Sequence, residues 1–121
     1  MLVCNFNSCN STKHNDDNQE NYQKYIGKSI NYFLEQNKGY SKLIINEGKP
    51  RVAISLLVIY PNSITIELFP KEFKYMKQFD ELGKWNLELF KKETIETIRI
   101  LKNNSVIDVV PYNENLFNPV D

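Results

Sequence analysis

The sequence has few of the residues on which most hydrolases depend. Its 121 residues include one histidine, His14, and two cysteines, Cys4 and Cys9, all close to the start of the chain. A serine or cysteine nucleophile needs a neighbouring base, most often histidine. A Ser-His or Cys-His pair in a domain that follows this stretch is therefore excluded. A Ser-Lys dyad stays open, but no pair stands out, and we expect the protein not to be an enzyme.

The usual metal and phosphate motifs are missing as well. Two cysteines and one histidine supply too few ligands for a structural zinc, and there is no Asp-rich calcium loop. Only four glycines occur, and Gly27-Lys28-Ser29 lacks the earlier glycine and the preceding strand of a phosphate-binding loop. We predict no metal and no cofactor.

The chain has no excess of charge of one sign. Lys+Arg and Asp+Glu are both 15, and the pI is about 6.6, so no net field attracts nucleic acid or an anionic membrane. We expect no nucleic-acid partner. The longest strongly apolar stretch, Val52 to Tyr60, is far shorter than the ~20 residues of a spanning helix. A hydrophobic content of 41% is nevertheless typical of a folded domain.

The opening stretch MLVCNFNSCNSTK places the small residue Ser8 directly before Cys9. This resembles the end of a bacterial lipoprotein signal, in which a Cys takes the lipid after cleavage ahead of it. Phe6 and Asn7 depart from the usual residues of such signals, and the basic start and most of the apolar region are not in the sequence. A start codon placed too late would explain the missing part. The alternative is a frayed N-terminus with two incidental thiols.

The polar run from Asn10 to Gln23 fits either interpretation. It has no aliphatic residue, so it buries too little surface to offset the entropy of ordering, and its His14 has no group to orient it. We predict three regions: a disordered tether or residual signal end over residues 1–21, one domain over 22–112, and a polar tail over 113–121.

Hydrophobic spacing outlines the domain. Tyr22, Ile26, Ile30 and Phe33 recur at helical intervals, with Ser29 as a plausible N-cap and Asn37-Lys38-Gly39 as a stop, which predicts a helix from about Lys28 to Asn37. Alternating and β-branched residues predict five strands, of which the second should lie centrally because it is apolar on both faces. The predicted strands are Lys42–Asn46, Arg51–Tyr60, Ser63–Phe69, Thr94–Leu101 and Val106–Val110.

Two connections are less uniform. Residues 70–84 suit a helix or a strand, and periodicity does not decide between them. Asn86 resembles the N-cap of a short helix through Lys92. Asn103 and Asn104 tolerate the positive φ of a tight hairpin between the last two strands.

This order predicts an α+β fold: an N-terminal helix, an antiparallel sheet of about five strands, and a short helix before a C-terminal β-hairpin. The stretches YIGKSINYFLEQ, IYPNSITIEL and WNLELFKKETIETIRI resemble small uncharacterised lipoproteins of Bacteroides-type bacteria. That family has no assigned activity, so the resemblance implies export and not a reaction.

Carboxylates are the remaining candidates for acid-base chemistry. Glu67 should alternate outward on its strand, and Glu88, Glu93 and Glu96 are interleaved with basic residues, as on solvated faces. A paired-acid glycosidase site would need two of them across a cleft, for which a domain of this size has little room.

The best candidate for a binding surface is FPKEFKYMKQF, in which lysines alternate with aromatic residues as in nucleic-acid or glycan platforms. The simpler interpretation places the aromatic residues in the core and the lysines in water. Trp85 is either a ligand platform or a core residue. The candidate surface comprises Lys71, Phe73, Lys74, Tyr75, Lys77 and Trp85.

Two functions remain after these exclusions. The first is a non-enzymatic lipoprotein domain at the cell envelope, a binding or structural module with an unknown protein or envelope partner and a membrane contact only through Cys9. The second is a soluble intracellular protein-protein interaction module, such as an inhibitor or an immunity-type protein. The oligomeric state does not follow from the sequence.

Overall fold

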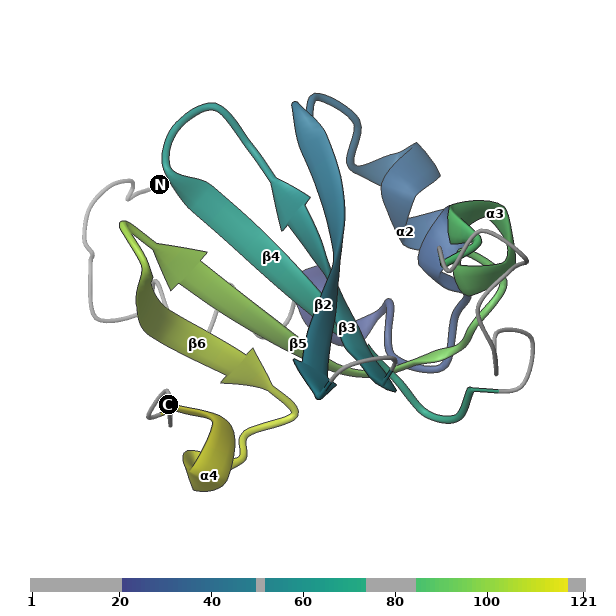
Figure 1. The fold of residues 1–121 in the computed structure, drawn as a ribbon. Helices are drawn as coiled ribbons and strands as arrows, with labels where there is room; N and C mark the ends of the chain where they lie inside the picture. Colours follow the sequence, from purple (N-terminus) through teal and green to yellow (C-terminus); the bar gives the residue numbers. More distant parts are fainter. Residues whose placement is uncertain (1–20, 50–51, 74–84, 118–121) are drawn as a thin grey trace.

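The computed structural model describes residues 21–49, 52–73 and 85–117 (Figure 1). It consists of a five-stranded sheet, an N-terminal helix and two short helices near the C-terminal strands. The elements are α2 (Ile30–Gln36), β2 (Lys42–Lys49), β3 (Val52–Ile59), β4 (Ile64–Pro70), α3 (Leu87–Phe90), β5 (Ile95–Lys102), β6 (Ser105–Val110) and α4 (Glu114–Phe117).

The sheet is an antiparallel meander in the order β2-β3-β4-β5-β6. Each strand pairs with the next one along the chain because short connections join them. The α+β class and the five antiparallel strands are therefore confirmed. The second predicted strand, β3, is an interior strand, as expected, and β4 occupies the middle because it has two strands on each side.

Local signals explain how α2 begins and ends. The Tyr32 backbone N–H donates to the Ser29 hydroxyl at 3.0 Å, so Ser29 is the predicted N-cap. At the other end, the Asn37 side chain donates to the Phe33 carbonyl at 2.9 Å, and Gly39 adopts φ +103° before β2. Glycine suits this positive φ because it has no Cβ.

The core lies between one face of the sheet and the helices α2 and α3, and we call this the helix-covered face. The N-terminus of α2 is joined to the end of α3, because Ile30 N–H donates to the Glu93 carbonyl and Asn31 N–H donates to the Lys91 carbonyl. Both helices lie on the same side of the sheet (Figure 1). The buried residues of this core are Tyr25, Ile30, Phe33, Leu34, Leu56, Val58, Ile66, Leu68, Phe90, Ile95, Ile98 and Ile100.

The C-terminal hairpin follows its predicted chemistry. Asn103 and Asn104 have φ of +52° and +67°, which Asn tolerates better than most residues. Pro111 directly follows the end of β6. The short helix α4 lies within the predicted tail and contacts β6. The predicted tether over residues 1–21 lies almost entirely outside the described residues.

Replacing Ile98 by Ala tests this core. Ile98 is fully buried on β5, so we expect the Ile98→Ala variant to lose about 2–5 kcal/mol of unfolding free energy through lost burial and the cavity left behind. Ile44→Ala is the matched control, because Ile44 is 39% exposed on β2 and its replacement should cost about 1 kcal/mol or less. Urea unfolding measures both, and equal losses would contradict this core assignment.

Candidate functional site

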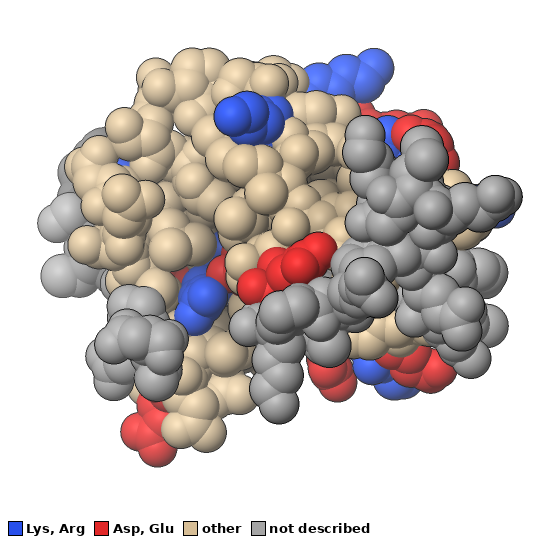
Figure 2. All heavy atoms as spheres, viewed as in Figure 1, with Lys and Arg blue, Asp and Glu red and all other residues tan. Residues whose placement is uncertain are grey.

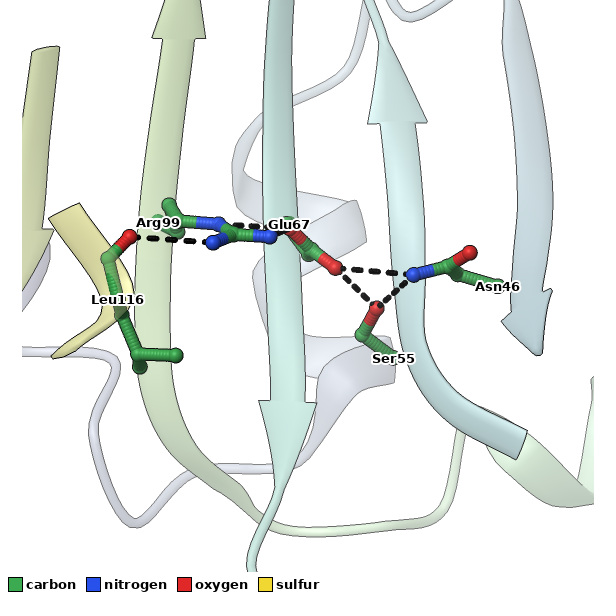
Figure 3. Close-up of polar contacts among 5 residues, drawn as sticks. All are labelled: Asn46, Ser55, Glu67, Arg99 and Leu116. Carbon is green, nitrogen blue, oxygen red and sulfur yellow. Dashed lines mark hydrogen bonds and ion pairs between the residues drawn. The ribbon is translucent and has the colours of Figure 1, made fainter. Parts of the chain in front are cut away.

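A row of polar side chains crosses the second face of the sheet, opposite the helices (Figure 3). Asn46, Ser55, Glu67 and Arg99 come from β2, β3, β4 and β5. Alternation along β4 produces this arrangement, because Ile66 and Leu68 enter the core and Glu67 between them points to the other face.

The Glu67 carboxylate is the centre of this polar row. Its Oε1 accepts from Arg99 Nη2 at 2.6 Å and from Arg99 Nε at 2.9 Å. Its Oε2 accepts from the Ser55 hydroxyl and, at 3.3 Å, from Asn46 Nδ2. Arg99 Nη1 also donates to the Leu116 carbonyl at 3.0 Å and so attaches the α4 segment to the sheet. Side chains from β2, β3 and β5 therefore meet at one carboxylate on β4, and Arg99 links this carboxylate to the C-terminal segment.

The predicted solvent exposure of Glu67 is wrong, because this residue is 2% exposed. Glu93 was also expected on a solvated face, and it is 1% exposed between α3 and β5. A buried carboxylate is tolerated where charged and neutral donors replace its water, as Arg99, Ser55 and Asn46 do for Glu67. Glu88 and Glu96 are exposed, as expected.

The geometry of the polar row suits a stabilising role better than a catalytic one. Both oxygens of Glu67 already accept hydrogen bonds, and the neighbouring Ser55 is fully buried. A serine that is to attack a substrate has to reach it, so the Ser55-Glu67 pair is not a nucleophile and its base. The polar row fixes the strands relative to one another.

The predicted binding surface is only partly described. Lys71 is exposed, whereas Phe73 is half-buried, with its ring centroid 6.4 Å from that of Phe90 in the core. Trp85 packs against the core, and its indole N–H donates to the Glu47 carboxylate. These three residues match the simpler interpretation, with aromatic residues inward and lysine in water. Lys74, Tyr75, Lys77 and Cys9 lie outside the described residues.

A cluster of tyrosines, which the sequence did not indicate as a site, lies at the C-terminal end of α2; we call it the tyrosine end. The Tyr25 and Phe33 rings meet edge to face at 4.9 Å, and Tyr22 stacks on Phe33 at 6.3 Å. The Tyr60 hydroxyl donates to the Asn37 carbonyl at 2.7 Å. The tyrosine end comprises Tyr22, Tyr25, Tyr32, Tyr40 and Tyr60.

Two open hollows adjoin at the tyrosine end, because Tyr22 and Asn37 line both of them. The first has a volume of about 270 Å³ and the second about 350 Å³. Tyr22, Asn37, Lys38, Tyr60, Asn62, Ile64 and Ile66 line the first hollow. Asn21, Tyr22, Lys24, Tyr25, Gln36 and Asn37 line the second.

Burial changes the acidity of this cluster. It raises the pKa of the Tyr60 hydroxyl from 10.0 to about 12, and the nearby hydroxyls of Tyr22, Tyr40 and Tyr25 add to the effect. Burial also raises the pKa of Tyr22. Both hydroxyls therefore stay protonated at neutral pH, and that of Tyr60 donates its proton to the Asn37 carbonyl.

Comparisons with known proteins do not assign the chain to a family. No family model, curated protein or solved structure matches the chain. Among the residues that the structure describes, no group of three His, Cys, Asp or Glu side chains is placed to hold a metal ion. The helices in the described part of the chain do not combine the length and apolar character that crossing a bilayer requires.

Removing Arg99 should destabilise the protein strongly. The Arg99→Met variant leaves the buried Glu67 without its cation, and we expect a loss of about 3–5 kcal/mol in urea unfolding. The surface pair Lys91-Glu88, 3.1 Å apart with Glu88 exposed, is the control, and Lys91→Met should cost about 1 kcal/mol or less.

The double variant Glu67→Leu/Arg99→Met separates the charge from the packing. It removes both charges, so it should be more stable than Arg99→Met alone. If the unfolding free energy lost in the double variant equals the sum of the losses in Glu67→Leu and Arg99→Met, the two charges do not stabilise each other.

The raised pKa of Tyr60 predicts a loss of stability in alkali. The folded state keeps this proton to a higher pH than the unfolded state, so the unfolding free energy should fall as the pH rises from 10.0 towards about 12. Tyr60→Phe cannot titrate and should show a shallower fall, which urea unfolding across this pH range measures. Parallel profiles for the two proteins would contradict the burial of this hydroxyl.

Proposed function

We propose that this chain is a non-enzymatic binding module attached to the cell envelope, outside the cytoplasm, by a lipid on Cys9. The observation that carries the attachment is Ser8-Cys9 followed by a polar stretch with no aliphatic residue. Tyr22, which packs against the core, is among the first residues of the described fold. Such a spacer would let the domain stand clear of a lipid surface.

The hydrogen bonds of the polar row support the proposal that the module is not an enzyme. Arg99, Ser55 and Asn46 donate hydrogen bonds to both oxygens of the Glu67 carboxylate. A general acid or base has to reach the substrate with which it exchanges a proton. Glu67 could do so only if this buried network were broken.

The surface supports recognition by local contacts. On the side seen in Figure 2, acidic and basic side chains lie in small separate groups among uncharged ones. With a net charge of +0, the protein has no broad field that would draw a polyanion from a distance. The two adjoining hollows of the tyrosine end offer a concave surface for a ligand.

Membrane fractionation of the native host tests the attachment. The protein, expressed from its own locus with the upstream DNA, should sediment with the membrane, and Cys9→Ala should move it out of that fraction. Cys4→Ala is the matched control and should leave the distribution unchanged. If Cys9→Ala also leaves it unchanged, the lipid on Cys9 is refuted and an interaction module inside the cell becomes the better proposal.

A further inference from the structure

The side chains that line the two hollows of the tyrosine end form a consistent set. Each hollow has tyrosine rings, at least two amide side chains and one lysine: Lys38 in the first hollow and Lys24 in the second. None of the described residues that line either hollow is Asp or Glu. The first hollow also has Ile64 and Ile66 in its lining. The ligand should therefore combine apolar faces with uncharged polar groups and carry negative charge near each lysine.

The amides indicate hydroxyl groups on the ligand. An Asn or Gln side chain both donates and accepts hydrogen bonds, as a sugar hydroxyl does. Asn62 lines the first hollow, Asn21 and Gln36 line the second, and Asn37 lines both. A ligand rich in hydroxyls can pair with this set in several orientations around each ring.

The rings indicate a flat ligand with apolar faces. Tyrosine has an apolar body and a polar tip, and sugar rings likewise carry C–H groups on their faces and hydroxyls at their rim. Tyr22 is common to both hollows, and Phe33 supports its ring at 6.3 Å. Volumes of about 270 Å³ and 350 Å³ lie close to the lower limit for small-molecule sites, so each hollow suits one small ring.

We propose that the tyrosine end binds an acidic oligosaccharide, with neighbouring sugar residues of the uronic acid class in the two hollows. Lys24 and Lys38 pair with the sugar carboxylates, and the amides pair with the hydroxyls. The protonated hydroxyls of Tyr22 and Tyr60 add no negative charge that would repel the ligand. This inference rests on the proposal of a binding module, but it does not depend on the lipid at Cys9.

Calorimetric titration of the full 121-residue chain with the tetrasaccharide of galacturonic acid tests this site. We expect binding that weakens about tenfold or more in the Lys24→Gln/Lys38→Gln variant. Both lysines are exposed, so the fold should survive their replacement. The matched control is Lys28→Gln/Lys42→Gln, which removes the same charge from lysines outside both hollows and should change the affinity by roughly twofold or less.

The aromatic contact has its own pair of variants. Tyr22→Ala should also weaken binding about tenfold or more, whereas Tyr112→Ala, at a residue 64% exposed and outside the tyrosine end and both hollows, should not. Circular dichroism checks that both variants are folded. If neither the lysine pair nor Tyr22 affects the affinity, the assigned site is wrong.

Three further results would overturn the inference. The first is no binding of the acidic tetrasaccharide, and the second is equal binding of the neutral tetrasaccharide of galactose. The third is tighter binding of single-stranded oligothymidylate with the same dependence on Lys24, Lys38 and Tyr22, which would identify a nucleic-acid site.

Mass spectrometry of the tetrasaccharide after incubation with the protein distinguishes failure of the oligosaccharide site from failure of the non-enzymatic module. Cleavage of the tetrasaccharide would refute the non-enzymatic module but would leave the oligosaccharide site in place.

Discussion

The Glu67 carboxylate on the middle strand needs partners that replace its water, and the rest of the sheet is arranged around this requirement. Arg99 on β5 supplies the opposite charge, while Ser55 on β3 and Asn46 on β2 supply neutral donors. Strand register brings these residues together, because Glu67 lies opposite Arg99 and Asn46 lies opposite Ser55. A shift of one residue in any of these strands would move its polar residue to the core face.

The residues that stabilise the sheet and the residues proposed to bind a ligand therefore lie in different parts of the molecule. The most polar cluster of the described residues is buried and fully engaged, so the sheet offers little free chemistry at its centre. Accessible polar groups line the hollows of the tyrosine end, where α2, the β3-β4 turn and residues 21–25 meet. The two regions should therefore respond differently to mutation: the polar row through stability and the tyrosine end through binding.

Much of the fold could be predicted from short-range signals. Ser29 and Asn86 act as N-caps, as predicted, and the predicted strand Ser63–Phe69 agrees with β4 to within one residue at each end. The burial of Glu67 could not be predicted in this way, because its partner Arg99 lies on another strand and only the register brings the two together.

The candidate site was missed for a similar reason. Tyr22 lies before α2 and packs against the core, and Tyr60 and Asn62 reach the same hollow only through the β3-β4 turn. The sequence instead indicated a surface of lysines and aromatic residues, of which Phe73 and Trp85 pack against the core and Lys71 is exposed. The measurement that tests the proposed function most directly is the intact mass of the protein purified from its native host. Our account predicts a chain that begins at Cys9 and carries the added mass of fatty acyl groups, whereas an unmodified chain that begins at Met1 would contradict it.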